Sequence, residues 1–245
     1  MLEGQVAIIT GGAKGIGRYI ATTYADAGAK VAIADVDLER LEQTAGELRT
    51  LGAETLAVTA DVRDEDSVRA LMERVAGEFG KIDILVNNAG IVPHFAWGVP
   101  HWPAIRDMDL SFWDRVIRTN LYGTFLCTKH VIPYMERQGG GHIINLHGGG
   151  GLRSCAYMVS KDAIWTFTRY VAMEVADANI CVVVMSPGAA IATEDAPEEA
   201  RQRMPGPEFA GNRFVLAATA PMALSGKLLT VQDGQLALDV HPALA

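Results

Sequence analysis

Short apolar runs alternate with amphipathic helical patterns along the chain, and this alternation limits the possible fold more than any other feature of the sequence. Most of the runs are apolar on both faces, as in parallel strands that helices cover on each side. Helical patterns such as residues 18–27, 38–51 and 65–79 separate them. The β-α-β order predicts an α/β fold: a single doubly wound domain over residues 1–245, with a mostly or fully parallel seven-stranded sheet flanked by helices. The predicted strands are 5–10, 30–35, 55–61, 82–88, 142–147, 180–186 and 227–232.

The composition is that of a globular protein and excludes several classes of partner. Hydrophobic residues make up 49%, charged residues 20%, and the net charge is −8. The absence of a Lys/Arg-rich run predicts no nucleic-acid partner, because that binding depends on cationic neutralisation of phosphates. The first residues lack the basic region of a secretion signal, and no apolar run approaches the roughly 18 residues that span a bilayer. We therefore expect a cytoplasmic protein with no membrane partner.

Cysteine and histidine do not form a metal-binding pattern. Cys127, Cys155 and Cys181 are widely spaced and include no C-x-x-C pair, so they are interpreted as buried or inert thiols. His94 and His101 have no convincing third ligand nearby. We expect no metal.

A glycine-rich turn follows the first predicted strand and opens the first helix, with the sequence TGGAKGIG at 10–17. Gly11 would permit the turn, Gly15 would let the backbone approach a pyrophosphate, and Gly17 would let the helix pack on the strand. The helix N-terminus presents N–H groups and a positive dipole to phosphate. The pattern favours nucleotide binding, and a purely structural turn is the alternative.

Asp35 ends the second predicted strand, about twenty residues beyond the glycines, where a carboxylate can accept hydrogen bonds from the adenosine ribose and repel a 2′-phosphate. NAD is therefore favoured over NADP as cofactor. Lys14 could attract that phosphate, or it is a solvated loop lysine. Asp61 could accept from the adenine amino group, or it serves as a turn or cap residue. The neighbouring Ile16, Val36 and Val62 belong to the same predicted cofactor site.

The motifs together resemble those of the short-chain dehydrogenase/reductase family, which has a Rossmann fold. They occur in the family's order and extend over essentially the whole chain. The matching segments are TGGAKGIG at 10–17, DV at 61–62, NNAG at 87–90, Asn120 within RTNLYGTF, YMVSK at 157–161 and SPG at 186–188.

This resemblance implies roles for the matching residues. Tyr157 would be the general acid/base, Lys161 would hold the nicotinamide ribose and lower the tyrosine pKa, and Asn120 would hold a water in a proton relay. Tyr157 and Lys161 stand at i and i+4 on one predicted helix, on the same face and about 6 Å apart along its axis. A nearby cation favours the phenolate. Further implied cofactor contacts are Asn88, Ala89, Gly90, Pro187 and Gly188, beside Tyr157 and Lys161 themselves.

One catalytic feature of the family is missing. Members commonly carry a serine at the end of the fifth strand, in an NISS-like context, whereas this chain reads NLHGGGG at 145–151 with a shortened loop before the tyrosine. His147 and Gly148 stand where the two serines would lie. His147 and Ser154 are the nearest candidate replacements for the substrate-binding hydroxyl, and Ser160 is expected to face away as a helix residue.

Two further segments lie where the carboxyl ends of the strands should form a ligand crevice. Residues 91–113 are longer than the resemblance leads us to expect and rich in aromatic residues and histidine. They would cover a substrate, with His94 and Trp97 as candidate contacts, or pack as a surface loop, locally or against another subunit. Residues 189–211 are acidic and contain proline, which suggests a flap near the cofactor.

The sequence leaves two functions to weigh. The first is an NAD-dependent oxidoreductase that transfers a hydride between nicotinamide and a small alcohol or carbonyl substrate. The second is a catalytically impaired dinucleotide-binding protein, a sensor or a scaffold subunit, that kept the cofactor site after losing the serine. Asn120, Tyr157 and Lys161 favour the first, because a pure binding protein does not need all three. The resemblance also implies a homo-oligomer, a tetramer or a dimer.

Overall fold

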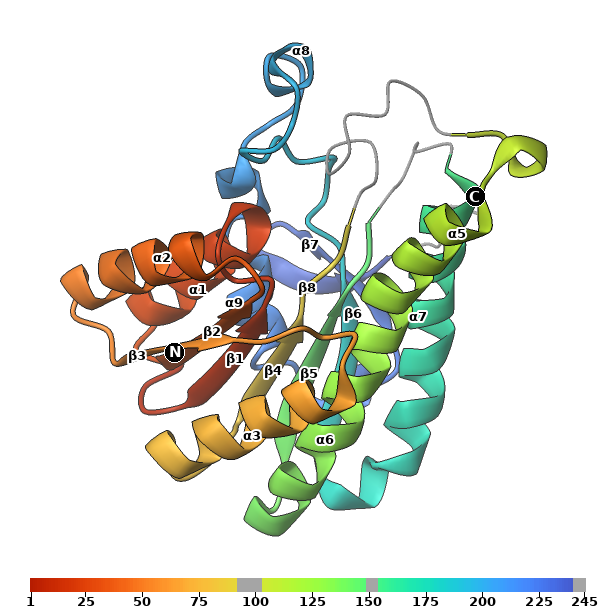
Figure 1. The fold of residues 1–245 in the computed structure, drawn as a ribbon. Helices are drawn as coiled ribbons and strands as arrows, with labels where there is room; N and C mark the ends of the chain where they lie inside the picture. Colours follow the sequence, from red (N-terminus) through yellow and green to blue (C-terminus); the bar gives the residue numbers. More distant parts are fainter. Residues whose placement is uncertain (92–102, 149–153, 240–245) are drawn as a thin grey trace.

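Strands and helices alternate along the chain in the computed structural model, which describes residues 1–91, 103–148 and 154–239 (Figure 1). The sheet order is β3-β2-β1-β4-β5-β6-β7-β8, and every pair from β3 to β7 is parallel. The fold is thus the predicted doubly wound α/β domain. The strands are β1 (Val6–Thr10), β2 (Lys30–Asp35), β3 (Thr55–Thr59), β4 (Ile84–Asn87), β5 (Gly141–Leu146), β6 (Ile180–Met185), β7 (Leu228–Gln232) and β8 (Gln235–Leu238).

Among the residues that the structure describes, the sheet has eight strands, so the predicted number of seven is wrong. The additional strand, β8, runs antiparallel to β7. Asp233 and Gly234 join the two strands, with φ values of 50° and 76°. Two successive residues with positive φ make the tight hairpin turn that Asp-Gly sequences favour. The segment after this turn is short and partly exposed, so it lacks the buried apolar run that identified the other strands.

Helices cover both faces of the sheet (Figure 1). The core on one face is built with α1, α2 and α9, and the core on the other with α3, α6 and α7. The helices that position the site are α1 (Gly15–Asp26), α2 (Leu38–Thr50), α3 (Glu65–Phe79), α5 (Leu110–Ile117), α6 (Gly123–Gln138), α7 (Cys155–Glu174), α8 (Glu198–Arg201) and α9 (Arg213–Ala217). Short 3-10 turns lie at Ile105–Asp107, Ala176–Ala178, Pro207–Ala210 and Met222–Leu224.

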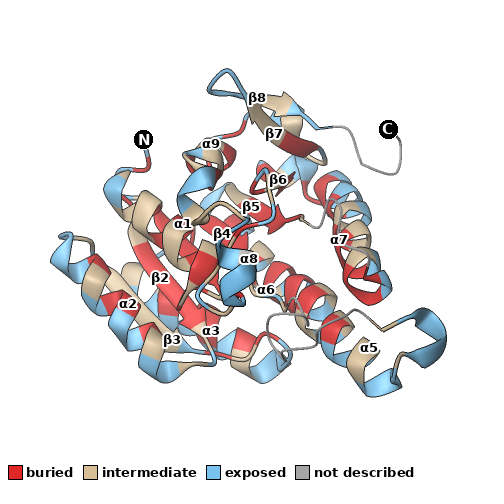
Figure 2. Cartoon of the chain, turned by 90° about the horizontal axis from the view of Figure 1, so that it is seen from above, coloured by how far each residue is buried: buried red, intermediate tan, exposed pale blue. Residues whose placement is uncertain are grey.

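The central strands are buried on both faces, as their unbroken apolar sequences predict. All residues of β1, β4 and β6 are buried. Figure 2 shows this buried sheet between helices whose outer faces are exposed. None of the helices in the described part of the chain is long and apolar enough to cross a membrane.

A chain of polar side chains crosses the buried layer where β4 pairs with β5. Asn87 and Asn145 are partners in the register of the two strands. Asn87 Nδ2 donates to Asn145 Oδ1 at 2.8 Å and to Thr128 Oγ1 at 3.1 Å. Asn145 Nδ2 donates to Thr168 Oγ1 at 2.8 Å. These hydrogen bonds connect β4 to α6 and β5 to α7, the helix that carries Tyr157.

The strand order changes direction at β1, which lies between β2 and β4. In doubly wound sheets the ligand crevice lies at such a point, beyond the carboxyl ends of the strands. The glycine-rich turn follows β1 there, and α7 brings Tyr157 to the same end of the sheet. Residues 92–102 of the 91–113 segment, with His94 and Trp97, lie outside the described residues.

Candidate functional site

A cavity of about 600 Å³ lies at the carboxyl ends of the strands, within the size range of ligand pockets. Every predicted cofactor residue except Gly188 lines it, and so does His147. Gly148, from the place of the missing serine, also lines it, as do Ile91, Ala189, Ala190, Ile191, Thr193, Asp195 and Met204 from the two segments that the sequence placed near the crevice. Residues that the sequence did not single out complete the lining: Ala34, Ala60, Arg63, Arg115, Thr119 and Leu146. The glycine-rich turn and the Tyr157–Lys161 pair therefore share one cavity.

The glycine turn is held closed by the strand beside it. Asn88 Nδ2 donates to the carbonyl oxygens of Thr10 and Gly11 at 2.8 and 2.9 Å. A Cβ at Gly11, whose φ is 64°, would lie 2.8 Å from Asn88 Nδ2, and a Cβ at Gly17 would overlap the Gly11 carbonyl oxygen. Glycine is thus needed at both positions because the backbone of the turn packs against Asn88 and the start of α1.

The first N–H of α1 already binds a negatively charged oxygen. Gly15 N donates to Glu194 Oε2 at 2.9 Å, and Arg18 lies 3.5 Å from the same carboxylate. The turn can therefore accept an anion, as the N-terminus of a helix is expected to do. The residues of the turn therefore fit a dinucleotide whose pyrophosphate takes the place of the Glu194 carboxylate at Gly15.

Two carboxylates lie at the part of the cavity where adenosine was predicted to bind: Asp35 ends β2, and Asp61 follows the end of β3 by two residues. Asp35 accepts backbone hydrogen bonds from Ala13 at 3.3 Å, from Val36 at 2.8 Å and from Asp37 at 3.2 Å. Asp61 forms a two-pronged ion pair with Arg63, at 2.7 to 3.1 Å, and also accepts from the Arg63 backbone N–H. The hydrogen bonds from Arg63 lower the pKa of Asp61 despite partial burial. Asp61 thus lines the cavity and also serves as a turn residue.

Tyr157 and Lys161 lie on one face of α7, both more than 90% buried. Lys161 Nζ is 5.6 Å from the centre of the Tyr157 ring and donates to the Leu146 carbonyl oxygen at 3.0 Å. Burial lowers the pKa of Lys161 to about 8 and raises the pKa of Tyr157 above that of a solvated phenol. The direction for the tyrosine pKa is opposite to the lowering that the resemblance implied, and its cause is desolvation by burial.

Asn120 is fully buried and does not line the cavity. It sits in a single π-helical turn, Arg118–Tyr122, that joins α5 to α6. Its Oδ1 accepts from Ile91 N at 2.8 Å, and its Nδ2 donates to Ser160 Oγ at 3.1 Å. Ser160 Oγ in turn donates to the Tyr157 carbonyl oxygen at 2.6 Å. Asn120 therefore links α7 to the loop after β4, and π-turns of this kind occur often at functional sites.

The three residues at the place of the missing serine have different surroundings. His147 is 5% exposed, and its Nε2 lies 3.6 Å from Asp162 Oδ1. Gly148 lines the cavity beside Tyr157. Ser154 is the N-cap of α7: its Oγ accepts from Tyr157 N at 3.4 Å, and it is not among the residues that line the cavity. The structure thus brings His147, but not Ser154, to the cavity surface.

The segment after β6 reaches the glycine turn, where the acidic composition of 189–211 predicted a flap near the cofactor. A Cβ at Gly15 would lie 2.9 Å from Thr193 Cγ2, and Asp195 forms ion pairs with Lys14 and Arg40. Gly188, which begins this segment, has a φ of 91°, and a Cβ there would lie 3.0 Å from the Arg213 guanidinium. Gly188 therefore faces Arg213, which explains its absence from the cavity lining.

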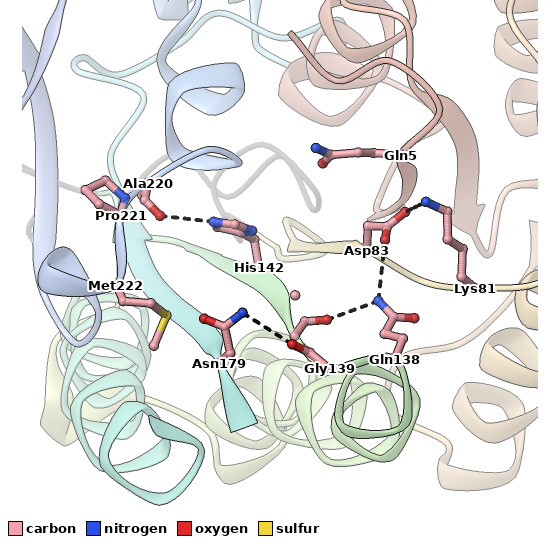
Figure 3. Close-up of a pocket in the computed structure, with 12 residues that line it drawn as sticks. Gln5, Lys81, Asp83, Gln138, Gly139, His142, Asn179, Ala220, Pro221 and Met222 are labelled. Atoms are coloured by element: carbon pink, nitrogen blue, oxygen red, sulfur yellow. Dashed lines mark hydrogen bonds and ion pairs between the residues drawn. The ribbon is translucent and has the colours of Figure 1, made fainter. Parts of the chain in front are cut away.

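A second hollow, of about 710 Å³, lies at the opposite end of the sheet, at the amino ends of the strands (Figure 3). Its polar side chains hold the strand ends together: His142 Nε2 lies 3.0 Å from the Ala220 carbonyl oxygen, Lys81 pairs with Asp83 at 2.8 Å, and Asp83 accepts from Val6 N at 2.7 Å. Figure 3 also shows Asn179 bonded to Gly139. The polar side chains of this hollow thus bind one another and the backbone at the amino ends of the strands. We therefore place the functional site at the other cavity, which contains the predicted cofactor residues. Among the described residues, no three His, Cys, Asp or Glu side chains group to hold a metal.

The fold and the cavity define a class of doubly wound α/β proteins that have a glycine-rich turn at the point where the strand order changes direction. The sequence matches the short chain dehydrogenase family over residues 5–203, and the chain belongs to that family of oxidoreductases. Members use nicotinamide dinucleotide cofactors.

Similar proteins support this assignment over nearly the full length. Cis-4-hydroxycyclohexanecarboxylate dehydrogenase of Sinomonas cyclohexanicum is 37% identical over 96% of this chain and 97% of its own. 3beta-hydroxysteroid dehydrogenase 2 of Eggerthella lenta is 37% identical over 77% of this chain and 72% of its own. The crystal structure of a short-chain type dehydrogenase/reductase from Mycobacterium marinum superposes with a TM-score of 0.82, at 34% identity and with 95% of each chain covered.

Proposed function

We propose that the chain is an NAD-dependent alcohol dehydrogenase or carbonyl reductase with Tyr157 as its general acid/base. One observation carries the proposal: Tyr157 and Lys161 line the same cavity as the glycine turn. A catalytic group must be within reach of both the cofactor and the substrate, and only a shared cavity meets that condition. NAD supplies the hydride acceptor when it is bound, and NADH the donor.

The residues around the cavity have separate tasks in this proposal. Gly15 and the start of α1 would bind the pyrophosphate, and Asp35 would accept from the adenosine ribose. Lys161, with a pKa of about 8, carries a proton in most molecules at neutral pH and would orient the nicotinamide ribose. Asn120 holds α7 against the loop after β4, and so acts as a positioning residue for Tyr157.

Burial determines the protonation state of Tyr157 before the reaction. Its raised pKa keeps the phenol protonated at neutral pH, the form that donates a proton to a carbonyl oxygen during reduction. Oxidation requires that Tyr157 first release its proton to solvent, and the phenolate oxygen then takes the proton of the substrate hydroxyl. A main-chain N–H near Gly148 or the side chain of His147 would hold the substrate oxygen in place of the family's serine. Losing one such donor typically costs about 10²–10³ in rate, so the enzyme survives the loss.

The relatives indicate which substrates to test. Their names specify a hydroxycyclohexanecarboxylate and a 3beta-hydroxysteroid. Both are ring-bearing alcohols, and the aromatic content of residues 91–113 is consistent with a cover for such a ring. We therefore propose a small cyclic secondary alcohol, or the corresponding ketone, as substrate.

The test is a spectrophotometric screen of cyclic alcohols with NAD and of cyclic ketones with NADH, with native protein and Tyr157→Phe. We expect turnover by the native protein and a loss of at least about 10²-fold in the variant, with NADH affinity nearly unchanged. If NADH binds but no substrate turns over, the chain is the catalytically impaired dinucleotide-binding protein instead. Equal turnover by both proteins would remove Tyr157 from the mechanism.

The same proposal includes a homo-oligomer that forms through α6 and α7. These helices expose apolar side chains at their outer surface: Phe125 is 45% exposed, Tyr170 64% and Met173 74%. A second copy of the chain with the same face would bury them, as the self-complementary interface of a symmetric dimer does.

A further inference from the structure

Asp195 lies between two cations at the adenosine side of the cavity. Its carboxylate pairs with Lys14 Nζ and, through Oδ1, with Arg40 Nη1 at 3.1 Å. Lys14 belongs to the glycine turn and Arg40 to the first turns of α2. A residue of the segment after β6 thus joins the elements that follow β1 and β2.

The two cations belong to segments next to Asp35, the predicted ribose-binding carboxylate. Ala13, the neighbour of Lys14, donates its backbone N–H to Asp35. Arg40 follows Asp35 by five positions and also lies 3.6 Å from Asp37. A cation near the adenosine ribose is what accommodates the 2′-phosphate of NADP. Lys14 and Arg40 would therefore favour NADP if their charges were not neutralised.

We infer that Asp195 is a second determinant of cofactor specificity, which favours NAD by neutralising Lys14 and Arg40 and by repelling a 2′-phosphate. This inference rests on the proposed function, because it requires that the cavity binds a nicotinamide dinucleotide. The inference explains how Lys14, which would attract a 2′-phosphate, can occur in the same chain as Asp35, which would repel it.

The charge state of Asp195 fits this role. Partial burial opposes its ionisation, but the hydrogen bonds from Lys14 and Arg40 outweigh burial and hold its pKa below the usual value. The hydrogen bond to Asp195 likewise raises the pKa of Arg40. Asp195 and Arg40 are therefore charged at neutral pH, and the electrostatic effect of Asp195 is present under ordinary assay conditions.

The neighbouring Glu194 provides a matched control. It binds Gly15 N and lies near Arg18, so it stands at the place of the pyrophosphate, which NAD and NADP have in common. Removing its charge should change the affinities for the two cofactors by similar factors. Removing the charge of Asp195 should change their ratio.

The experiment is a fluorescence titration of the full chain with NADH and with NADPH. We expect Asp195→Asn to raise the affinity for NADPH relative to NADH by about tenfold, because one repulsive charge is removed and two attractive ones are released. Glu199→Gln, which removes an exposed carboxylate of the same segment, should leave the ratio unchanged. Glu194→Gln should change the ratio much less than Asp195→Asn, because Glu194 makes the smallest electrostatic contribution to Arg40. In the double variant Asp195→Asn/Arg40→Met, much of the gain should disappear.

Three results have distinct meanings. An unchanged ratio in Asp195→Asn, or an equal change in Glu194→Gln, overturns the role of Asp195. Native protein that binds neither dinucleotide overturns the proposed function itself. Native protein that binds NADPH as tightly as NADH shows that Asp195 does not outweigh the two cations, which also overturns the inference. Circular dichroism of each variant distinguishes a changed ratio from a folding defect.

Discussion

The side-chain position of Gly148 faces the hydroxyl of Tyr157. A Cβ at residue 148 would lie 3.5 Å from Tyr157 Oη, an ordinary contact, and no other atom comes within 4 Å of it among those described. Residue 148 is thus the place from which a small hydroxyl side chain could reach the substrate oxygen beside the tyrosine.

Gly148→Ser should therefore raise kcat. The added hydroxyl would supply a donor to the developing oxyanion, and such a donor is worth up to about 10²–10³ in rate. Gly148→Ala, which adds the Cβ without the hydroxyl, is the control and should not raise kcat. Steady-state kinetics with the best substrate of the screen measures both. An equal gain in serine and alanine variants would assign the effect to packing, and no gain in either would mean that another group already holds the oxygen.

Ser154 should act through the stability of α7. Its hydroxyl caps the helix that carries Tyr157, and loss of an N-cap costs about 1 kcal/mol. Ser154→Ala should lower the free energy of unfolding by about that amount, whereas Ser154→Thr, which keeps the capping hydroxyl without adding a charge at this buried position, should lose less. Urea denaturation compares the three proteins. If both variants unfold like the native chain but both lose turnover, Ser154 binds substrate, as the sequence alone allowed.

Lys161 should make the protein more stable as the pH rises from about 8 to 10.5. Its pKa is about 8 in the folded chain against 10.5 for a solvated lysine, so in this window the unfolded chain binds more protons and stability increases with pH. The shift corresponds to about 3 kcal/mol. Lys161→Met lacks this contribution, so the difference in unfolding free energy between native protein and variant should change by that amount. Taking the difference cancels the opposite contributions of Tyr157 and Cys127, whose pKa values burial raises. A difference independent of pH would contradict the burial of a titrating lysine.

Charges on the exposed face of α7 should break the proposed oligomer. Tyr170→Glu/Met173→Glu places two like charges on each copy at a face that would pair with itself. Light scattering after size exclusion should show a dimer or tetramer for the native chain and a smaller species for the variant. Leu51→Glu, at an exposed apolar residue after α2, is the control. A native monomer, or dissociation by both variants, would refute an interface at α7.

The fold was predictable because the buried strands have unbroken apolar sequences that a local reading detects. Strand β8 was missed since its stability depends on the hairpin at Asp233 and Gly234 and on pairing with β7, not on an apolar run of its own. Hydrophobic periodicity reflects burial. It therefore identified the buried strands and the domain class, but it did not identify β8, which is a partly exposed edge strand.

The cavity was predictable in its lining but not in its contacts. Motif positions brought the glycine turn and Tyr157 together, yet nothing local indicates that Asp195 meets Lys14, from which it is separated by most of the chain. The cap role of Ser154 follows from where α7 begins, and helix ends are difficult to place from sequence. The direction of the Tyr157 pKa shift likewise depends on burial, which cannot be predicted from the spacing of residues along a helix.

The paired amides of Asn87 and Asn145 also bear on how the chain avoids wrong structures. If β4 slipped by one residue against β5, each amide would face an apolar neighbour, and a buried polar group without a partner costs about 1–3 kcal/mol. Neighbouring strands of similar apolar sequence offer little else to distinguish one alignment from the next. The hydrogen bond between these two asparagines therefore favours the correct register of β4 and β5. In that register the carboxyl ends of both strands lie level at the cavity.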